Sequence, residues 1–397
     1  MYKAAKGAQD LVGSSYTQIQ RLIELTEKEF VAAGGEPLET PVFERTDVLL
    51  GKYGEEADTK LIYRLADEGG EPLSLRYDLT VPFARYVKEN GVKQMRRYSV
   101  GKVYRRDQPN TKAGRYREFY QADFDIYGEK QEGMIAEATL LNSVCRILDG
   151  LGLGYTILIN DVRNLQYLLS EKMGLSEWKK LCPVIDKLDK QSFASLEPEF
   201  SALGLSCEQQ AQLETLLQEE RPFLEKSVED FSALSDLAGV FGFREKLVFT
   251  NSLARGLDYY TGFIWEFKLD GFASTVSAGG RYDGLLGGPA VGISVGISRL
   301  ATLLSAPEPE WKEEYYVATV GAVSILDKMR VVKKLQDSDD KPVLYSLSLT
   351  DRKLGKIITD CCTSYTRYVV IVGESELAEG KFSVKDLKEK TQKVMEI

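Results

Sequence analysis

The feature that most constrains the fold is a pair of strand-like segments joined by a short basic loop, within residues 97–126. In residues 97–104, large side chains alternate with Arg, Ser, Gly and Val, which is the period-two pattern of a strand with two different faces. Residues 107–114 (DQPNTKAG) are rich in turn formers. From Tyr116 to Ile126 the sequence is again strand-like and aromatic. These segments predict an antiparallel hairpin whose loop can fold over a ligand.

This hairpin concentrates positive charge in an acidic chain. Nine basic residues and one acidic residue, Asp107, lie between Lys93 and Arg117, whereas the formal net charge of the whole chain is -9. The fixed fork of an arginine side chain matches two phosphate oxygens at once. The pattern predicts a site for a triphosphate or for nucleic acid, and charge alone does not distinguish the two.

The chain contains no histidine. Catalytic Ser-His-Asp and Cys-His arrangements and His-containing zinc sites are therefore excluded. Chemistry must come from Arg, Lys, Asp, Glu, Tyr, Ser, Thr or a bound metal ion. The odd number of cysteines, without CxxC spacing in a chain of 397 residues, indicates reduced thiols.

Changes of texture along the chain predict its domains. Residues 164–243 are helical, charged and poor in glycine, and strand-like sequence resumes at Leu247, which indicates an insertion at about 164–245. From Tyr315 onward, strand and helix patterns alternate, which predicts a small α/β domain with a largely parallel sheet. We expect a first domain at 1–305, a linker at 306–314 and a second domain at 315–397. The N-terminus has no apolar h-region and no segment is long enough to span a bilayer, so we expect a cytoplasmic protein without a membrane partner.

Several polar residues interrupt apolar or aromatic segments. Asp78, Thr80, Gln121 and Asp125 are of this kind. A partly buried carboxylate needs a partner, which an incoming ammonium or imidazole N–H could supply, although pairing with a nearby arginine is the stronger reading of the pattern alone. The glycine runs at 279–280 and 292–296 form no P-loop or GxGxxG motif. They permit either close strand packing or the close approach of a ligand such as adenine.

Together these segments resemble the histidyl-tRNA synthetases, class II aminoacyl-tRNA synthetases, in their eukaryotic form. Residues 6–10 (KGAQD) resemble the family's N-terminal element, and residues 37–44 (PLETPVFE) resemble motif 1, a dimer-interface element. Residues 104–119 resemble motif 2 and residues 292–300 motif 3. LARGLDYYTG (253–262) and AGGRYDGL (278–285) resemble two histidine-specific motifs. The resemblance covers essentially the whole chain, although many relatives carry histidine near the position of Ser99.

The resemblance implies a mixed α/β (α+β) fold, with a class II antiparallel sheet flanked by helices, a helical insertion and a C-terminal α/β anticodon-binding domain. It implies a homodimer that ligates L-histidine to histidine tRNA through a histidyl-adenylate, with ATP as substrate, Mg²⁺ as cofactor and no metal site made of protein ligands alone.

The resemblance also assigns residues to ATP. Arg105 would contact the α-phosphate and Arg299 the γ-phosphate, while Arg255 would face the histidine carboxylate and the α-phosphate from the opposite side. Arg115 would join the contacts to the triphosphate. Asp107 would lie near the adenine, and Phe119 would stack on it.

A second set is assigned to histidine. Three polar residues would hold the α-amino group: Asp78, Thr80 and Gln121. Asp125 and Tyr260 would read the imidazole, with Tyr259 beside them in the pocket. On the residues alone, the two tyrosines fit the core as well as a pocket.

Three rival functions share parts of this pattern. A non-charging paralogue, such as the regulatory subunit of ATP phosphoribosyltransferase, usually has altered histidine motifs and no C-terminal domain. Here Arg105, Arg255, Arg299 and the α/β tail are all present, which disfavours that function. A tRNA-binding pseudo-synthetase module typically lies within a longer chain and lacks the catalytic arginines. A prolyl or threonyl enzyme agrees with motif 2 alone but not with LARGLDYY.

Overall fold

The computed structural model describes residues 2–50, 61–66, 69–129, 131–254, 259–272, 274–304, 311–338, 340–346 and 353–397. The chain divides into two compact units, residues 1–305 and 306–397. Arg255 and residues 306–310 of the expected linker lie outside the described residues. Within the described part of the chain, no helix is long and apolar enough to cross a membrane. All five cysteines are free thiols, as expected.

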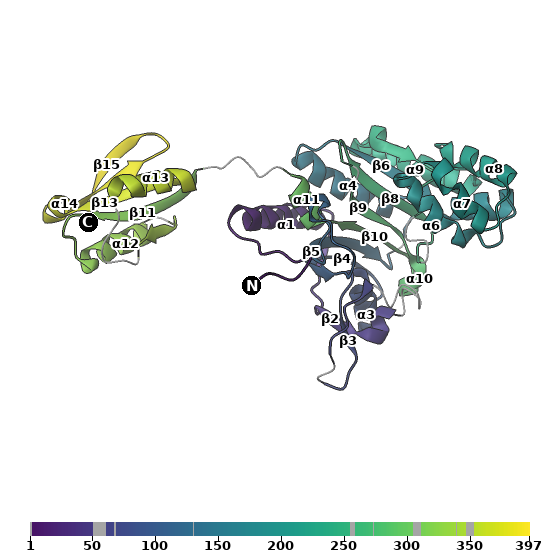
Figure 1. Ribbon diagram of the computed structural model, residues 1–397, viewed down its shortest axis with the longest axis horizontal. Helices are drawn as coiled ribbons and strands as arrows, with labels where there is room; N and C mark the ends of the chain where they lie inside the picture. The colour runs from purple at the N-terminus through teal and green to yellow at the C-terminus, as the bar shows by residue number, and fades with distance from the viewer. Residues whose placement is uncertain are drawn as a thin grey trace. The chain divides into compact units, whose positions relative to one another are not determined.

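The first unit is built on a large sheet whose central strands run antiparallel to their neighbours (Figure 1). Among the described residues, eight strands follow the order β1-β4-β5-β10-β9-β8-β6-β7, and the edge pairs β1–β4 and β6–β7 are parallel. Their bounds are β1 Glu36–Pro37, β4 Met95–Tyr104, β5 Glu118–Tyr127, β6 Tyr155–Asp161, β7 Leu247–Phe249, β8 Phe263–Leu269, β9 Thr275–Arg281 and β10 Ala290–Val295. Two short strands, β2 (Phe43–Arg45) and β3 (Leu73–Leu75), form a separate antiparallel pair.

The predicted hairpin is confirmed in β4 and β5, which pair from Met95↔Tyr127 to Tyr104↔Glu118. The connecting loop contains a 3-10 turn, Thr111–Ala113, whose N-cap Asn110 accepts a hydrogen bond from the backbone N–H of Ala113. This register determines which face of the sheet each side chain of the hairpin occupies.

One face of the sheet is apolar and is covered by helices α1 (Ser14–Ala32), α4 (Ile135–Gly150) and α11 (Ile297–Leu303), as Figure 1 shows. Phe30 of α1 packs on this face, with its ring centroid 6.3 Å from that of Tyr98 and 5.1 Å from that of Phe124. Because strand side chains alternate, the neighbours of Phe124 on β5 point to the opposite face. That opposite face carries the polar residues of β5.

A helical segment lies between β6 and β7. It contains α5 Val162–Gln166, a π-helical turn Tyr167–Lys172, α6 Cys182–Ile185, α7 Phe193–Ala202, α8 Cys207–Gln218 and α9 Glu225–Phe241. Buried residues such as Leu196, Phe200 and Leu213 give it an apolar core of its own. Figure 1 shows α7 and α8 to the side of the large sheet rather than on either face. Two further helices, α3 (Thr80–Asn90) and α10 (Asp283–Leu286), pack together near the hairpin.

The second unit is a mixed sheet with helices. Its elements are β11 Lys312–Val320, α12 Ile325–Ser338, β12 Val343–Tyr345, α13 Leu354–Ser364, β13 Thr366–Gly373, α14 Glu374–Ala378, β14 Lys381–Asp386 and β15 Thr391–Glu396. The strand order is β12-β11-β13-β14-β15. The first three strands are parallel, but β14 and β15 add two antiparallel pairings, so the expectation of a largely parallel sheet was wrong. β11 begins at Lys312, so residues 312–314, expected in the linker, are strand. The expected fold class, an antiparallel sheet flanked by helices followed by an α/β domain, is confirmed.

Candidate active site

A pocket of about 800 Å³ opens on the polar face of the large sheet. Its walls come from β5, β8, β9 and β10, from the hairpin loop, from the turn before α3 and from the start of α11. All the candidate site residues that the structure describes line this one pocket: Asp78, Thr80, Arg105, Asp107, Arg115, Phe119, Gln121, Asp125, Tyr259, Tyr260 and Arg299. The remaining candidate, Arg255, lies outside the described residues.

Strand alternation explains why β5 supplies so much of the pocket. Gln121, Asp123 and Asp125 are spaced by two residues and therefore share the polar face, and all three are buried. Opposite Asp125 on β10 stands Gly292. A Cβ atom at Gly292 would lie 2.1 Å from Oδ1 of Asp125, so glycine leaves the space that the carboxylate occupies.

Arg105 lies at the end of β4 and is held between two aromatic rings. Its guanidinium carbon is 4.4 Å from the ring centroid of Tyr77 and 5.2 Å from that of Phe119. Nε donates to the backbone carbonyl of Tyr77 at 3.2 Å, and Nη2 donates to Oε1 of Gln121 at 3.3 Å. These contacts fix a cation at the pocket wall, because the stacking and the hydrogen bonds both restrict its rotation.

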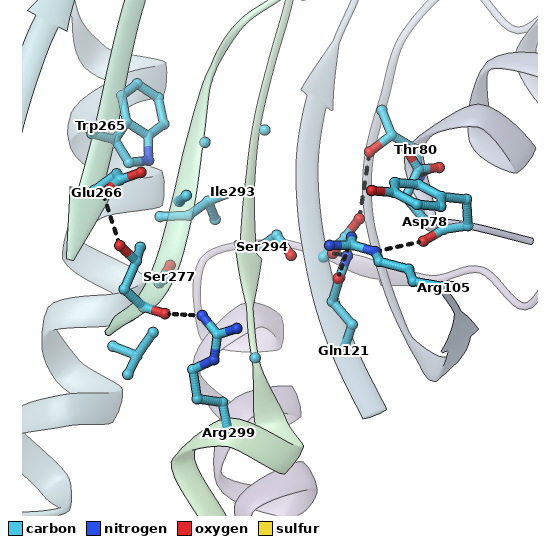
Figure 2. Close-up of a pocket in the computed structure, with 18 of the residues that line it drawn as sticks. Asp78, Thr80, Arg105, Gln121, Trp265, Glu266, Ser277, Ile293, Ser294 and Arg299 are labelled. Carbon is cyan, nitrogen blue, oxygen red and sulfur yellow. Dashed lines mark hydrogen bonds between the residues drawn. The ribbon is translucent and has the colours of Figure 1, made fainter. Parts of the chain in front are cut away.

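Arg299 enters the pocket from the start of α11, after β10 and Gly296. Its Nη1 donates to the backbone carbonyl of Thr275, and the hydroxyl of Thr275 donates to Oε2 of Glu266 at 2.8 Å. Figure 2 shows Glu266 and Arg299 on one side of Ser294, with Arg105, Gln121, Asp78 and Thr80 on the other. Glu266 was not predicted from the sequence, although a lone carboxylate within the apolar segment FIWEFKL was a usable signal.

The hairpin loop packs on α11. Gly114 has a φ of +66°, and a Cβ atom there would lie 3.0 Å from the Cα atom of Arg299. The hydroxyl groups of Tyr116 and Thr302 are 3.2 Å apart, and the backbone N–H of Tyr120 donates to the hydroxyl of Ser298 at 2.9 Å. These contacts hold the loop residues Asp107 and Arg115, which are exposed, at the pocket wall.

The other end of the pocket is acidic. Oδ1 of Asp78 accepts hydrogen bonds from the backbone N–H groups of Thr80 at 3.1 Å and Val81 at 2.9 Å. Asp123 accepts a hydrogen bond from Gln121 at 2.8 Å, and its other oxygen lies 3.5 Å from the hydroxyl of Thr80. Burial raises the pKa of Asp123, and the positive charge of Arg97 acts in the opposite direction. Asp123 therefore joins two candidate residues, Thr80 and Gln121.

Asp125 is bound on both of its oxygens. Oδ1 accepts a hydrogen bond from the hydroxyl of Tyr282, and Oδ2 forms an ion pair with Nη2 of Arg97 at 2.8 Å. The arginine partner that the pattern favoured is thus present, and the carboxylate also lines the pocket. The rings of Tyr259 and Tyr260 stack with centroids 4.2 Å apart. Burial raises the pKa values of Tyr260 and Tyr282, so both hydroxyls remain protonated at neutral pH.

Comparison with known proteins shows the family of the chain. The histidyl-tRNA synthetase family profile matches residues 7–300, and the anticodon binding domain profile matches residues 316–397. The chain is 38% identical over 412 residues to the probable cytoplasmic histidine–tRNA ligase of Encephalitozoon cuniculi, covering 96% of this chain and 93% of that protein. It is 36% identical over 432 residues to the mitochondrial histidine–tRNA ligase of Bos taurus, covering 97% and 84% respectively.

A solved structure shares the fold. Histidyl-tRNA synthetase from Nostoc sp. PCC 7120 superposes with a TM-score of 0.79 at 24% identity, covering 100% of this chain and 97% of that one. The family profile and the sequence matches show that the chain is an aminoacyl-tRNA synthetase. This chain belongs to the histidyl-tRNA synthetase family, one of the families of aminoacyl-tRNA synthetases.

Proposed function

We propose that this chain ligates L-histidine to histidine tRNA in two steps in the pocket on the polar face of the sheet. The carboxylate of histidine attacks the α-phosphate of ATP, which gives histidyl-adenylate and releases pyrophosphate. The histidyl group is then transferred to the terminal ribose hydroxyl of the tRNA. The observation that carries this proposal is the convergence of two arginines, Arg105 and Arg299, with the buried carboxylates of β5 in one pocket.

The first step needs no side-chain base, because its nucleophile is already an anion. It needs alignment of the reactants and stabilisation of the negative charge on the phosphates. We assign Arg105 to the α-phosphate, since its stacking and hydrogen bonds fix its guanidinium beside Gln121 in the pocket. We assign Arg299 to the γ-phosphate and Arg255 to the histidine carboxylate. This division explains how a chain without histidine can catalyse the reaction.

The adenine is assigned to the hairpin. Phe119 lies on β5 beside Arg105 and offers a ring for stacking. Asp107 and Arg115 stand on the loop that closes this side of the pocket, where Asp107 would lie near the adenine and Arg115 near the triphosphate. Contacts of the loop with α11 would couple ATP binding to the placement of Arg299.

Histidine is assigned to the acidic end. Asp78, Thr80 and Gln121 would hold the α-ammonium group, with Asp123 bridging the last two. Asp125 would accept the imidazole N–H, and the hydroxyl of Tyr260 would donate to the other ring nitrogen. A buried carboxylate left without a donor penalises amino acids that lack the imidazole N–H, so polar contacts with both nitrogens favour histidine strongly.

Mg²⁺ is proposed as the partner of ATP. In nucleotide enzymes Mg²⁺ is commonly bound by one or two carboxylates together with substrate phosphates. Glu266, which is buried beside Thr275 and close to Arg299, fits that requirement. In the described part of the chain, no group of three or more acidic or cysteine side chains is placed to hold a metal ion without substrate. When bound, the ion would neutralise charge on the phosphates.

We assign adenylate chemistry to residues 1–305, including the helical insertion at about 164–245, and anticodon reading to residues 315–397. Residues 37–44, which resemble motif 1, would contribute to a homodimer. We propose a cytoplasmic location, as in the name of the Encephalitozoon cuniculi relative, whereas the Bos taurus relative is named mitochondrial. Cell fractionation distinguishes the two locations.

A charging assay tests the function. Purified protein is incubated with ATP, labelled histidine and transcripts of histidine or proline tRNA. We expect acid-precipitable histidine only with the histidine tRNA. Absence of charging in a folded protein that binds ATP and histidine would instead favour the non-charging paralogue, a regulatory subunit that does not ligate histidine to tRNA.

A further inference from the structure

Arg97 is a buried cation beside the proposed histidine end of the pocket. It lies on β4 directly opposite Asp125 of β5, and its side chain is fully buried. It is not among the residues that line the pocket. Arg97 therefore cannot contact a bound substrate directly and must act, if at all, through its neighbours.

The guanidinium joins two parts of the proposed histidine site. Nη2 lies 2.8 Å from Oδ2 of Asp125 and also donates to the backbone carbonyl of Leu79 at 2.9 Å. Leu79 stands between Asp78 and Thr80, so the same nitrogen contacts the turn assigned to the α-ammonium group. The guanidinium carbon is 4.5 Å from the ring centroid of Phe83, which closes the remaining side.

Stability alone does not account for this arrangement. Removing two charges from water costs several kcal/mol per ion by typical estimates, and the attraction of a buried pair commonly does no more than offset that cost. Nε and Nη1 of Arg97 are buried and have no hydrogen-bond partner among the residues that the structure describes, which adds to the cost. A buried pair of this kind contributes orientation more readily than net stability.

The positive charge of Arg97 offsets the negative charge of buried carboxylates in the pocket. Asp78, Asp123 and Asp125 are 7%, 2% and 2% exposed, and all three line the pocket. Buried carboxylates this close together favour protonation of one another, and a protonated Asp125 would present the wrong hydrogen-bonding pattern to an imidazole N–H. Arg97 supplies the compensating charge from outside the pocket, and Tyr282 fixes the second oxygen of Asp125.

We propose that Arg97 is a positioning residue for histidine recognition: it keeps the Asp125 carboxylate ionised and oriented toward the imidazole, and it ties that carboxylate to the Asp78–Thr80 turn. This inference rests on the proposed function, because it assigns Asp125 to the imidazole. It extends that function to a residue that does not touch the substrate.

The test is a double-mutant cycle in histidine-dependent ATP–pyrophosphate exchange. The full-length proteins are wild type, Arg97→Met, Asp125→Asn and the double variant, each checked for folding by circular dichroism. We expect Arg97→Met to raise the KM for histidine by about 10- to 100-fold, the typical cost of leaving a buried charged group without its partner. The KM for ATP should change by less than about threefold. The double variant should resemble Asp125→Asn, because Arg97 acts through Asp125.

Arg96→Met is the matched control. Arg96 is the neighbour of Arg97 on β4, its side chain points to the other face, and it forms an ion pair with Glu129 at 2.7 Å outside the pocket. It should leave the KM for histidine unchanged. Arg97→Lys keeps the buried charge but loses the nitrogen that contacts both Asp125 and Leu79, and it should raise the KM for histidine less than Arg97→Met does.

Three results would overturn the inference. The first is an unchanged KM for histidine in folded Arg97→Met, with a loss only in the amount of active enzyme. The second is a double variant in which the two single effects multiply. If Arg97→Met does not fold, Arg97→Lys decides, and a KM for histidine equal to that of wild type counts against the inference. Wild-type protein without histidine-dependent exchange would remove the proposed function itself and the inference with it.

Discussion

At the scale of single residues, the site depends on carboxylates that are buried on one face of β5. Asp123 bonds to Gln121 and lies within reach of Thr80, so it bears on both neighbours that we assign to the α-ammonium group. Its charge is costly in this environment, since burial raises its pKa. That cost predicts a pH-dependent contribution to stability.

We predict that Asp123→Asn gains stability relative to wild type as the pH rises above about 4. An acid whose pKa is raised by folding binds more protons in the folded state than in the unfolded state, from the unfolded pKa of about 4 upward. The stability of wild type is therefore reduced as pH rises through that window, whereas asparagine does not titrate. Thermal unfolding of both proteins at several pH values measures the difference. A difference that is flat with pH would show that Asp123 is not held at a raised pKa.

Arg255 gives the second prediction at this scale, and it rests on the resemblance alone because the residue lies outside those described. We expect Arg255→Ala to slow adenylate formation by about 10²- to 10³-fold, the typical cost of losing one group that stabilises transition-state charge. Calorimetry should still detect histidine binding in the folded variant. Near-normal rates of pyrophosphate exchange would refute the assigned role.

The candidate residues could be predicted from sequence because they belong to motifs, whereas their partners could not. Gln121 and Asp125 were identified, but Asp123 lies between them at the same spacing and was passed over. Arg97 was read only as part of a basic patch, because its burial beside Asp125 depends on strand register. Burial that arises from pairing between strands is not visible in a linear pattern.

At the scale of elements, the contact between the hairpin loop and α11 brings the two halves of the proposed ATP site together. Gly114 makes this contact possible, since its φ of +66° disfavours other residues and its missing side chain admits the backbone of Arg299. The loop and the helix therefore form one unit of the site.

We predict that Gly114→Ala raises the KM for ATP by about tenfold or more, because the added methyl group must displace the loop from Arg299. It should also destabilise the fold by about 1–2 kcal/mol from the left-handed backbone alone. Gly133→Ala is the matched control, because Gly133 has a φ of +57° and, beyond its chain neighbours, no described residue has an atom within 4 Å of a Cβ placed there. The control should lose similar stability and keep the KM for ATP. Equal KM values for ATP in the two variants would remove the role of this contact.

The hairpin was predictable because its two strands alternate clearly and a turn-rich loop separates them. The antiparallel end of the second sheet was not, because β14 (Lys381–Asp386) and β15 (Thr391–Glu396) are rich in polar residues. β15 is an exposed edge strand, so no apolar face marks it in the sequence. The direction of strand pairing there is set by the short connection from β14, which suits antiparallel strands.

At the scale of the whole molecule, the two units have separate apolar cores. The core of residues 1–305 lies between the large sheet and α1, α4 and α11, and the second unit has its own core around Val317, Val331 and Val370. Since each unit buries its own apolar surface, the first should fold without the second.

We predict that a protein ending at Ser305 retains histidine-dependent ATP–pyrophosphate exchange within about threefold but charges tRNA at least tenfold more slowly, because it loses the contacts assigned to the anticodon. Both activities are measured on the same preparation. Charging equal to that of the full chain would contradict the assignment of residues 315–397 to the anticodon.

The most direct test of the account is ATP–pyrophosphate exchange by the wild-type protein, with histidine, proline, threonine or no amino acid. We predict exchange with histidine alone, since the acidic end of the pocket is assigned to the imidazole and the arginines to ATP. If a folded protein shows no exchange with any of these amino acids, the proposed function is contradicted and the non-charging paralogue is favoured. Exchange with proline or threonine instead would show that the pocket reads a different side chain.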